Sequence, residues 1–377
     1  MNSERLSRTF ITLCEIDSPS RGEAKLASYL CSLFRELGAD SIFEDDSRAA
    51  TGSDTGNLLI RFVGGLEHSP PVCFNCHLDV INPCLGIKVR KINDVFSSAG
   101  DTVLGADDKA GIAILLETIA SLREQRIPFA PLEILLTTCE EIGLLGAKSF
   151  DGSRLRSVYG FALDSTGVDT VVTGAPASHA VVAEIRGLAA HAGLRPRYGI
   201  NAIQIAAKAI ARLPMGQLDD LSTANIGIIA GGTATNIVPD LVQVKGEIRS
   251  HDPARLSSYL DLYHQIFHQA VDGWNDPQHL TGSTPSLYFQ TPLQYPAMLL
   301  AEDSLPLAKA RQAAQALKRP LTFHRAGGGS DANFLNAAGL PCAILGIGME
   351  NVHSTSETIS LADMLRTAEF VHSLLTC

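Results

Sequence analysis

Side chains that can bind a metal or transfer a proton recur at similar positions along this sequence. Each of them follows a short apolar run or opens an apolar helix, and the set comprises His77, Asp79, Asp107, Glu140, Glu141, Asp164 and His353. Zinc accepts imidazole and carboxylate ligands, and a catalytic zinc site leaves one position open for water. The residue types therefore point to hydrolysis assisted by bound metal.

No single member of this set is diagnostic. A lone histidine after a strand is usually structural, an aspartate at a helix start is usually a cap, and adjacent glutamates usually lie on a solvated face. The inference depends on their convergence, because several carboxylates gathered at one place would repel one another without cations.

Spacing within the set separates the expected roles. Residues two apart in an extended segment face the same side, so Asp79 is expected to lie near His77 and orient its ring. Adjacent residues diverge, so Glu140 and Glu141 need not share one function. One can bind metal while the other takes a proton from a water molecule that the metal activates.

A sheet of buried strands is expected to bring these residues together. Apolar runs predict strands at 58–63, 72–77, 132–138, 158–163 and 343–348, and helices at 22–37, 110–122, 303–317 and 361–375. Strands that alternate with helices favour an α/β fold with a mostly parallel sheet covered on both faces. Such sheets carry their sites at the carboxyl ends of the strands, where the candidate residues lie.

The pattern changes near residue 175, which predicts a second domain in this chain of 377 residues. Alternating strands in SHAVVAEIRG, TANIGIIAGG and LVQVKGEIRS, with helices at 201–213 and 254–270, indicate a smaller α+β insert. Turn-forming residues over 271–292 are expected to close it. The predicted organisation is a discontinuous domain, residues 1–174 and 290–377, interrupted by a lid of residues 175–289.

Composition argues against several classes of protein. The formal net charge is −10 and no Lys/Arg run occurs, so we expect no nucleic-acid partner. No stretch approaches the roughly 20 apolar residues of a membrane span, and the start lacks an apolar signal core. These features predict a cytoplasmic protein without a membrane partner. Cys73 and Cys76 form a CxxC, but they lie in a predicted strand and face opposite sides, so neither a metal knuckle nor a redox pair is expected.

Ten motifs identify a family resemblance. In chain order they are HLDV, LGADDKAG, TTCEEIGLLGAK, ALDST, AAHAG, TANIG, GGTATNIVPD, EIRS, GGGSDAN and NVHSTSE. Together they resemble the peptidase T-like tripeptidases, which belong to the di-zinc superfamily of aminoacylases, acetylornithine deacetylases and glutamate carboxypeptidases. The resemblance covers nearly the whole chain. It implies a zinc-exopeptidase-like mixed sheet covered by helices, with an inserted lid that also mediates homodimerisation.

The resemblance also implies a role for each candidate. Two Zn²⁺ ions, or cobalt or manganese in the same ligands, are held by His77, Asp107, Glu141, Asp164 and His353, with Asp107 as the bridge. Glu140 is the general base, Asp79 supports His77, and His191 of the lid stabilises the oxyanion in the partner subunit's site. Substrate contacts are implied for Asn236, Arg249, Gly328 and Ser330.

The activity that this resemblance implies is hydrolysis of short peptides by a tripeptidase or aminopeptidase. An N-acyl amino acid or N-carbamoyl amide hydrolase remains an alternative, because the same metal centre serves those reactions. A non-catalytic peptide-binding protein is the alternative of a different class, although the ligands and the base are all present in this sequence. The glycine-rich segment 326–333 lacks the Lys-Ser/Thr ending of a phosphate loop, so a nucleotide site is not expected.

Overall fold

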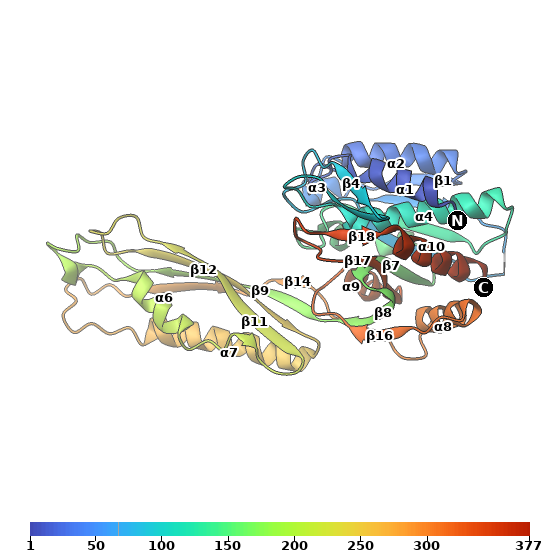
Figure 1. Ribbon diagram of the computed structural model, residues 1–377. Helices are drawn as coiled ribbons and strands as arrows, with labels where there is room; N and C mark the ends of the chain where they lie inside the picture. The colour runs from blue at the N-terminus through green and yellow to red at the C-terminus, as the bar shows by residue number, and fades with distance from the viewer. Residues whose placement is uncertain (67) are drawn as a thin grey trace. The chain divides into compact units, whose positions relative to one another are not determined.

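The computed structural model describes residues 1–66 and 68–377, which form two compact units. The first unit comprises Met1–Ala175 and Met298–Cys377, and the second comprises Pro176–Ala297 (Figure 1). The second unit is therefore inserted into the sequence of the first. None of the helices in the described residues combines the length and the apolar composition that a membrane span requires.

A nine-stranded mixed sheet forms the centre of the first unit. The strand order is β1-β2-β6-β3-β7-β17-β8-β15, and β16 pairs with β8. The bounds are β1 Ser41–Glu44, β2 Leu58–Phe62, β3 Val72–His77, β6 Leu132–Thr137, β7 Tyr159–Thr166, β8 Val168–Ala175, β15 Met298–Leu299, β16 Thr322–Arg325 and β17 Cys342–Met349. The inner strands β6, β3, β7 and β17 are parallel neighbours, so their carboxyl ends meet at one edge.

The inner strands are buried because apolar side chains emerge from both faces of the sheet. Every residue of β3, β6 and β17 is buried. Phe74 and Cys76 belong to the main core cluster, whereas Cys73 belongs to a separate cluster. The prediction that Cys73 and Cys76 face opposite sides of a strand is therefore confirmed, and both are free cysteines.

Helices supply the covering layers of this sheet. Helix α10 contacts α1, α4 and α8 through the main core, and α1 also contacts α4. Helix α9 contacts β17 and β15. The helices are α1 Ser3–Cys14, α2 Ala24–Glu36, α3 Arg48–Thr51, α4 Ala106–Glu124, α5 Leu145–Ser149, α8 Leu305–Leu317, α9 Ala332–Ala337 and α10 Leu361–Thr376. Helix α4 is buried from Ala106 to Leu122, as its nearly all-apolar sequence predicts.

Two smaller features complete the first unit. A three-stranded sheet has the order β18-β5-β4, with bounds β4 Val89–Ile92, β5 Val95–Ser98 and β18 Thr358–Ser360. A short 3-10 helix, η1, spans Gly152–Arg154.

The second unit is a six-stranded antiparallel sheet with two helices packed against it. The strand order is β10-β11-β12-β9-β13, and β14 pairs with β9. The bounds are β9 Ala177–Arg186, η2 Pro196–Tyr198, α6 Ala202–Ile210, β10 Gly216–Gln217, β11 Ser222–Gly231, β12 Leu241–Ser250, α7 Pro253–Asp272, β13 Ser286–Gln290 and β14 Leu293–Tyr295. Helix α7 begins sharply because Asp252 accepts hydrogen bonds from the N–H groups of Ala254 and Arg255.

The two ends of the insert lie on neighbouring strands of the first unit. Strand β13, which spans the predicted boundary at 289, pairs with β9, so the second unit continues to Ala297. Strands β8 and β15 are antiparallel partners, and Ala175 lies opposite Met298. The chain therefore leaves and re-enters the first unit at adjacent positions.

Candidate metal centre

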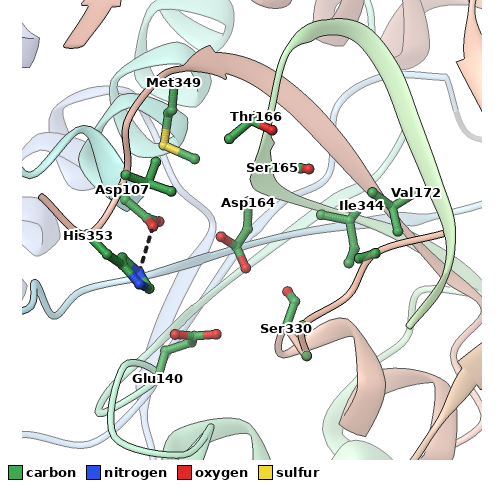
Figure 2. Close-up of a pocket in the computed structure, with 14 residues that line it drawn as sticks. Asp107, Glu140, Asp164, Ser165, Thr166, Val172, Ser330, Ile344, Met349 and His353 are labelled. Atoms are coloured by element: carbon green, nitrogen blue, oxygen red, sulfur yellow. Dashed lines mark ion pairs between the residues drawn. The ribbon is translucent and has the colours of Figure 1, made fainter. Parts of the chain in front are cut away.

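The carboxyl ends of the parallel strands and the start of α4 bring six of the candidate residues together within the first unit. His77 ends β3, the pair Glu140 and Glu141 follows β6, and Asp164 lies near the end of β7. Asp107 opens α4, and His353 follows β17. Figure 2 shows Asp107, Glu140, Asp164 and His353 around one cavity.

Asp107 lies between the two histidines. Its Oδ1 is 3.0 Å from Nε2 of His77, and its Oδ2 is 3.4 Å from Nε2 of His353. Nε2 of His353 is also 3.0 Å from Oε2 of Glu141. Ligand atoms of His77, Asp107 and Glu141 all lie within 4.8 Å of one another, as a metal site requires. The two oxygens of one carboxylate therefore face two different imidazoles.

The electrostatics of the cluster favour a cation. Burial raises the pKa of Asp164 to about 8, and it also raises the pKa values of Glu140 and Glu141 above their ordinary range. Burial acts on Asp107 in the same sense, but hydrogen bonds with His353 and His77 outweigh it and lower the pKa of Asp107. Nearby positive charge keeps buried carboxylates ionised, so the donor set fits divalent cations of the zinc type.

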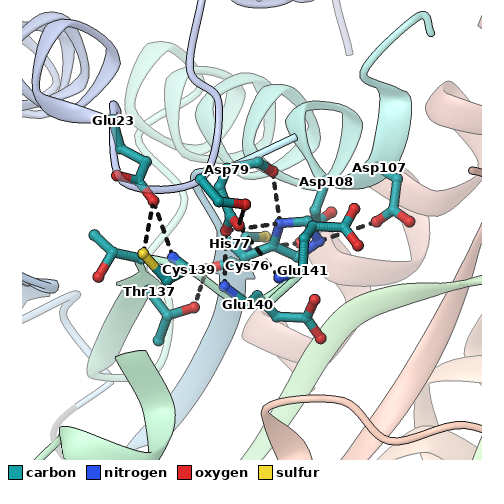
Figure 3. Close-up of polar contacts among 12 residues, drawn as sticks. Glu23, Cys76, His77, Asp79, Asp107, Asp108, Thr137, Cys139, Glu140 and Glu141 are labelled. Carbon is teal, nitrogen blue, oxygen red and sulfur yellow. Dashed lines mark hydrogen bonds and ion pairs between the residues drawn. The ribbon is translucent and has the colours of Figure 1, made fainter. Parts of the chain in front are cut away.

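Asp79 contacts His77 by a route that the sequence did not predict. Nδ1 of His77 lies 2.9 Å from the main-chain carbonyl oxygen of Asp79, whereas the nearer carboxylate oxygen of Asp79 is 3.7 Å away. The carboxylate instead accepts hydrogen bonds from the N–H groups of Glu140 at 2.9 Å and Glu141 at 3.2 Å (Figure 3). It also accepts one from the hydroxyl of Ser20 at 2.6 Å. Asp79 therefore links the histidine to the glutamate pair.

Two buried glutamates near the cluster were not among the predicted residues. Glu23 accepts a hydrogen bond from the hydroxyl of Ser53 at 2.5 Å. It also accepts one from the N–H of Cys139 at 2.9 Å (Figure 3). Glu357 accepts hydrogen bonds from main-chain N–H groups at the start of α4. Glu357 lies in the NVHSTSE motif, which is a signal that could have found it, whereas Glu23 lies outside all ten motifs.

A cavity of about 240 Å³ adjoins the cluster within the first unit. Its lining includes two of the predicted substrate residues, Gly328 and Ser330, from the glycine-rich loop before α9. Drug-sized ligands usually occupy pockets of roughly 300–1,000 Å³, so this cavity suits a small group next to a reacting bond.

The other predicted residues, His191, Asn236 and Arg249, belong to the second unit. His191 is exposed, and its Nδ1 accepts hydrogen bonds from the N–H groups of Gly193 and Leu194, each at 3.2 Å. The main-chain carbonyl of Asn236 accepts a hydrogen bond from the N–H of Ala192 at 2.9 Å, next to His191. Arg249 forms an ion pair with Glu247 at 3.0 Å.

Fold and site together place the chain among α/β enzymes that carry their chemistry at the carboxyl ends of parallel strands. The chain belongs to peptidase family M20/M25/M40, whose model matches residues 73–376. It is a peptide hydrolase of the peptidase T type.

Individual relatives agree with this assignment. The protein YqjE of Bacillus subtilis (strain 168), described as uncharacterized, is 36% identical over 376 residues, which cover 100% of this chain and 98% of that protein. The crystal structure of aminopeptidase PepT from Bacillus cereus ATCC 10987 is 38% identical with a TM-score of 0.88, covering 100% of this chain and 98% of the other. A tripeptidase structure from Staphylococcus aureus subsp. aureus Mu50 is 33% identical with a TM-score of 0.92 and the same coverage.

Proposed function

We propose that this peptidase hydrolyses short peptides as a tripeptidase or aminopeptidase and depends on two divalent cations, with zinc as the first choice. His77 and Asp164 would hold one cation, Glu141 and His353 the other, and Asp107 both. The observation that carries the proposal is the placement of the two Asp107 oxygens towards separate histidines, at 3.0 and 3.4 Å. Bound cations supply a water of lowered pKa and polarise the scissile carbonyl.

Glu140 is the proposed general base. Its side chain lines the cavity, while its N–H is held by Asp79 at 2.9 Å. From this position its carboxylate takes a proton from the attacking water and passes it to the leaving amine. Burial raises the pKa of Glu140 above that of an ordinary glutamate, which suits a group that must gain and then lose a proton.

His191 is the proposed donor to the oxyanion, and it would act in the partner subunit of a homodimer. Because its Nδ1 accepts hydrogen bonds from two main-chain N–H groups, the neutral ring carries its proton on Nε2. The Nε2–H group takes no part in the hydrogen bonds with Gly193 and Leu194, so it can donate to a developing negative charge. Asn236 and Arg249 would bind the substrate carboxylate, for which a guanidinium is well suited.

Strand β11 offers a surface for such a dimer. Strand β10 pairs only with Thr223 and Ala224 of β11, so residues 225–231 have an open side among the described strands. Ile228 and Ile229 on this segment are 56% and 55% exposed. Open edges with exposed apolar side chains favour pairing with another chain, here a second copy.

The cytoplasmic location of the protein stays a prediction from the sequence.

Replacing Glu140 with Gln tests the catalytic proposal. We expect the E140Q variant to keep its metal content while kcat falls by about 10²–10⁴-fold, because a neutral amide cannot take the proton. The measurement is kcat on a panel of tripeptides, dipeptides, and acetylated and carbamoylated amino acids, with zinc-loaded and chelator-treated enzyme. The exposed Glu350 provides a matched control, E350Q, which should behave as wild type.

Each outcome of this experiment is decisive. Near-normal turnover by E140Q would remove Glu140 as the base. Preference for acylated amino acids over every peptide would replace the tripeptidase assignment with that of an amide hydrolase. Full activity of chelator-treated enzyme would exclude the dependence on metal.

A further inference from the structure

Glu357 is a buried carboxylate that the proposed chemistry does not use. It is only 2% exposed, and burial raises the pKa of its side chain. Burying a carboxylate is costly unless it receives several hydrogen bonds. Glu357 receives three, from the N–H groups of Leu104 at 2.8 Å, Gly105 at 2.8 Å and Asp107 at 3.0 Å. All three donors belong to the segment that presents Asp107.

The segment that contains Glu357 is itself a closed loop. Glu350 and Thr358 exchange main-chain hydrogen bonds at 2.9 and 3.0 Å, which close residues 350–358 at their base. Within the loop, the N–H of Glu357 donates to the carbonyl of Ser354 at 3.1 Å. Strand β18, which follows directly, pairs with β5 and anchors the loop to the rest of the unit. His353 and Glu357 are therefore parts of one constrained piece of backbone.

This loop contacts Asp107 at two different points. Glu357 holds the main-chain N–H of Asp107, and Nε2 of His353 lies 3.4 Å from its Oδ2. The positions of the two candidate ligands, 246 residues apart in sequence, are thus set by the same loop. Figure 2 shows the resulting approach of His353 to Asp107 beside the cavity.

We propose that Glu357 is a positioning residue that sets the distance between Asp107 and His353, and thereby the affinity of the centre for its cation. The inference rests on the proposed metal dependence. Glutamine at this position would turn one acceptor oxygen into an N–H donor facing main-chain N–H groups. The segment before α4 would then move away from the loop, and the two ligands would separate. Partners of metal ligands typically change metal affinity by about 10–100-fold when they are replaced.

The test is the dissociation constant for Zn²⁺, measured by chelator competition on full-length protein well below its unfolding temperature. We expect E357Q to bind Zn²⁺ about 10–100-fold more weakly than wild type, and E357D, which keeps the acceptors on a shorter stem, to lie between them. The exposed E350Q change, in the same loop, should leave the constant unchanged. The visible spectrum of the Co²⁺ form provides a second readout and should shift in E357Q.

Other outcomes separate the possible failures. A folded E357Q protein with wild-type Zn²⁺ affinity would overturn the inference, even if its metal-free form unfolds at a lower temperature, because Glu357 would then be merely structural. If E357Q fails to fold, wild-type affinity of E357D would overturn it equally. Wild-type enzyme that binds no Zn²⁺ and cleaves no peptide would instead contradict the proposed function itself.

Discussion

At the scale of single residues, the main chain around the glutamate pair is held by two buried carboxylates. Asp79 accepts the N–H groups of Glu140 and Glu141, and Glu23 accepts that of Cys139. Cys139 has φ of +55°, a conformation that non-glycine residues rarely adopt. The strained residue directly before Glu140 is therefore stabilised by the hydrogen bond that its N–H donates to the distant Glu23.

This arrangement predicts a catalytic defect for E23Q. The N–H of Cys139 would face an amide that accepts more weakly, so Glu140 would be positioned less accurately. We expect kcat to fall by about 10–100-fold with little change in KM or metal content. Steady-state kinetics and metal analysis check this, with E36Q at the exposed end of α2 as the control. Wild-type kcat in E23Q would show that Glu23 has no part in positioning the base.

The sequence predicted the residues that project into the site, but not those that act through the main chain. His77, Asp107 and Glu141 stand in short motifs after apolar runs, and the structure brings their ligand atoms together. Glu23 and Glu357 contact main-chain groups 116 and 250 residues away in the sequence. Such contacts leave no local pattern, because any N–H group can be the donor. Asp79 lies beside His77 as expected, but its contact runs through the main-chain carbonyl, which no side-chain pattern predicts.

At the scale of helices and strands, the sequence predicted the bounds of strands well where every residue of the strand is buried. Strand β3 has the predicted bounds, and β6 differs by one residue at its end. Strand β4 is largely exposed and has no apolar periodicity, so it was missed. Strand β13 lies among turn-forming residues, and only Leu287 and Phe289 of it pack against the core of the second unit. Exposed strands form because they hydrogen-bond to partner strands, and the sequence alone does not identify those partners.

Helix α7 is joined to the turn before β11 by the carboxylate of Asp219, whose ionisation should affect stability. Burial raises the pKa of Asp219, but hydrogen bonds from the N–H of Leu221 and the hydroxyl of Tyr259 outweigh it and lower the pKa to about 2. Because its pKa is lower in the folded state, ionised Asp219 stabilises the protein at pH values above its unfolded pKa near 3.8. This stabilisation is lost as pH falls towards 2.

We therefore expect D219N to be less stable than wild type at pH 7 and to lose less stability on acidification. The difference in unfolding temperature between the two proteins should shrink between about pH 4 and pH 2. Thermal unfolding across this range checks the expectation. The exposed Asp272 at the end of α7 provides the control, D272N, which should follow wild type. A difference that stays constant with pH would contradict the assignment to Asp219.

At the scale of the whole molecule, the change of sequence pattern near residue 175 predicted an insert. The second unit begins at Pro176 and ends at Ala297, and all five proposed metal ligands lie in the first unit.

Removal of metal should therefore destabilise the first unit in particular. A free ligand at 100 times its dissociation constant stabilises the folded state by about 2.7 kcal/mol. Chelation should therefore measurably lower the unfolding temperature of the first unit. Identical unfolding curves with and without chelator would contradict the metal centre.

The dimer prediction belongs to the same scale. Lysine in place of both Ile228 and Ile229 would put charge on the open edge of β11 and oppose pairing between copies. We expect the mass in solution to fall to the 40.1 kDa of one chain, and activity to fall with it, because His191 would lose the partner's site. Light scattering during gel filtration measures the mass, and V63K, at another exposed apolar residue, is the control. A wild-type protein that is already monomeric would contradict the prediction.

The pairing of Ala175 with Met298 has a consequence for how such a protein can be modified. Because the insert is attached at two adjacent backbone positions, a two-residue Asn-Gly hairpin could replace all of Pro176–Ala297 without altering the strand order of the sheet. The shortened polypeptide would retain every proposed metal ligand and lose His191, Asn236 and Arg249. The same attachment would allow another module to be grafted at this position, so that cation binding and substrate choice could be engineered separately.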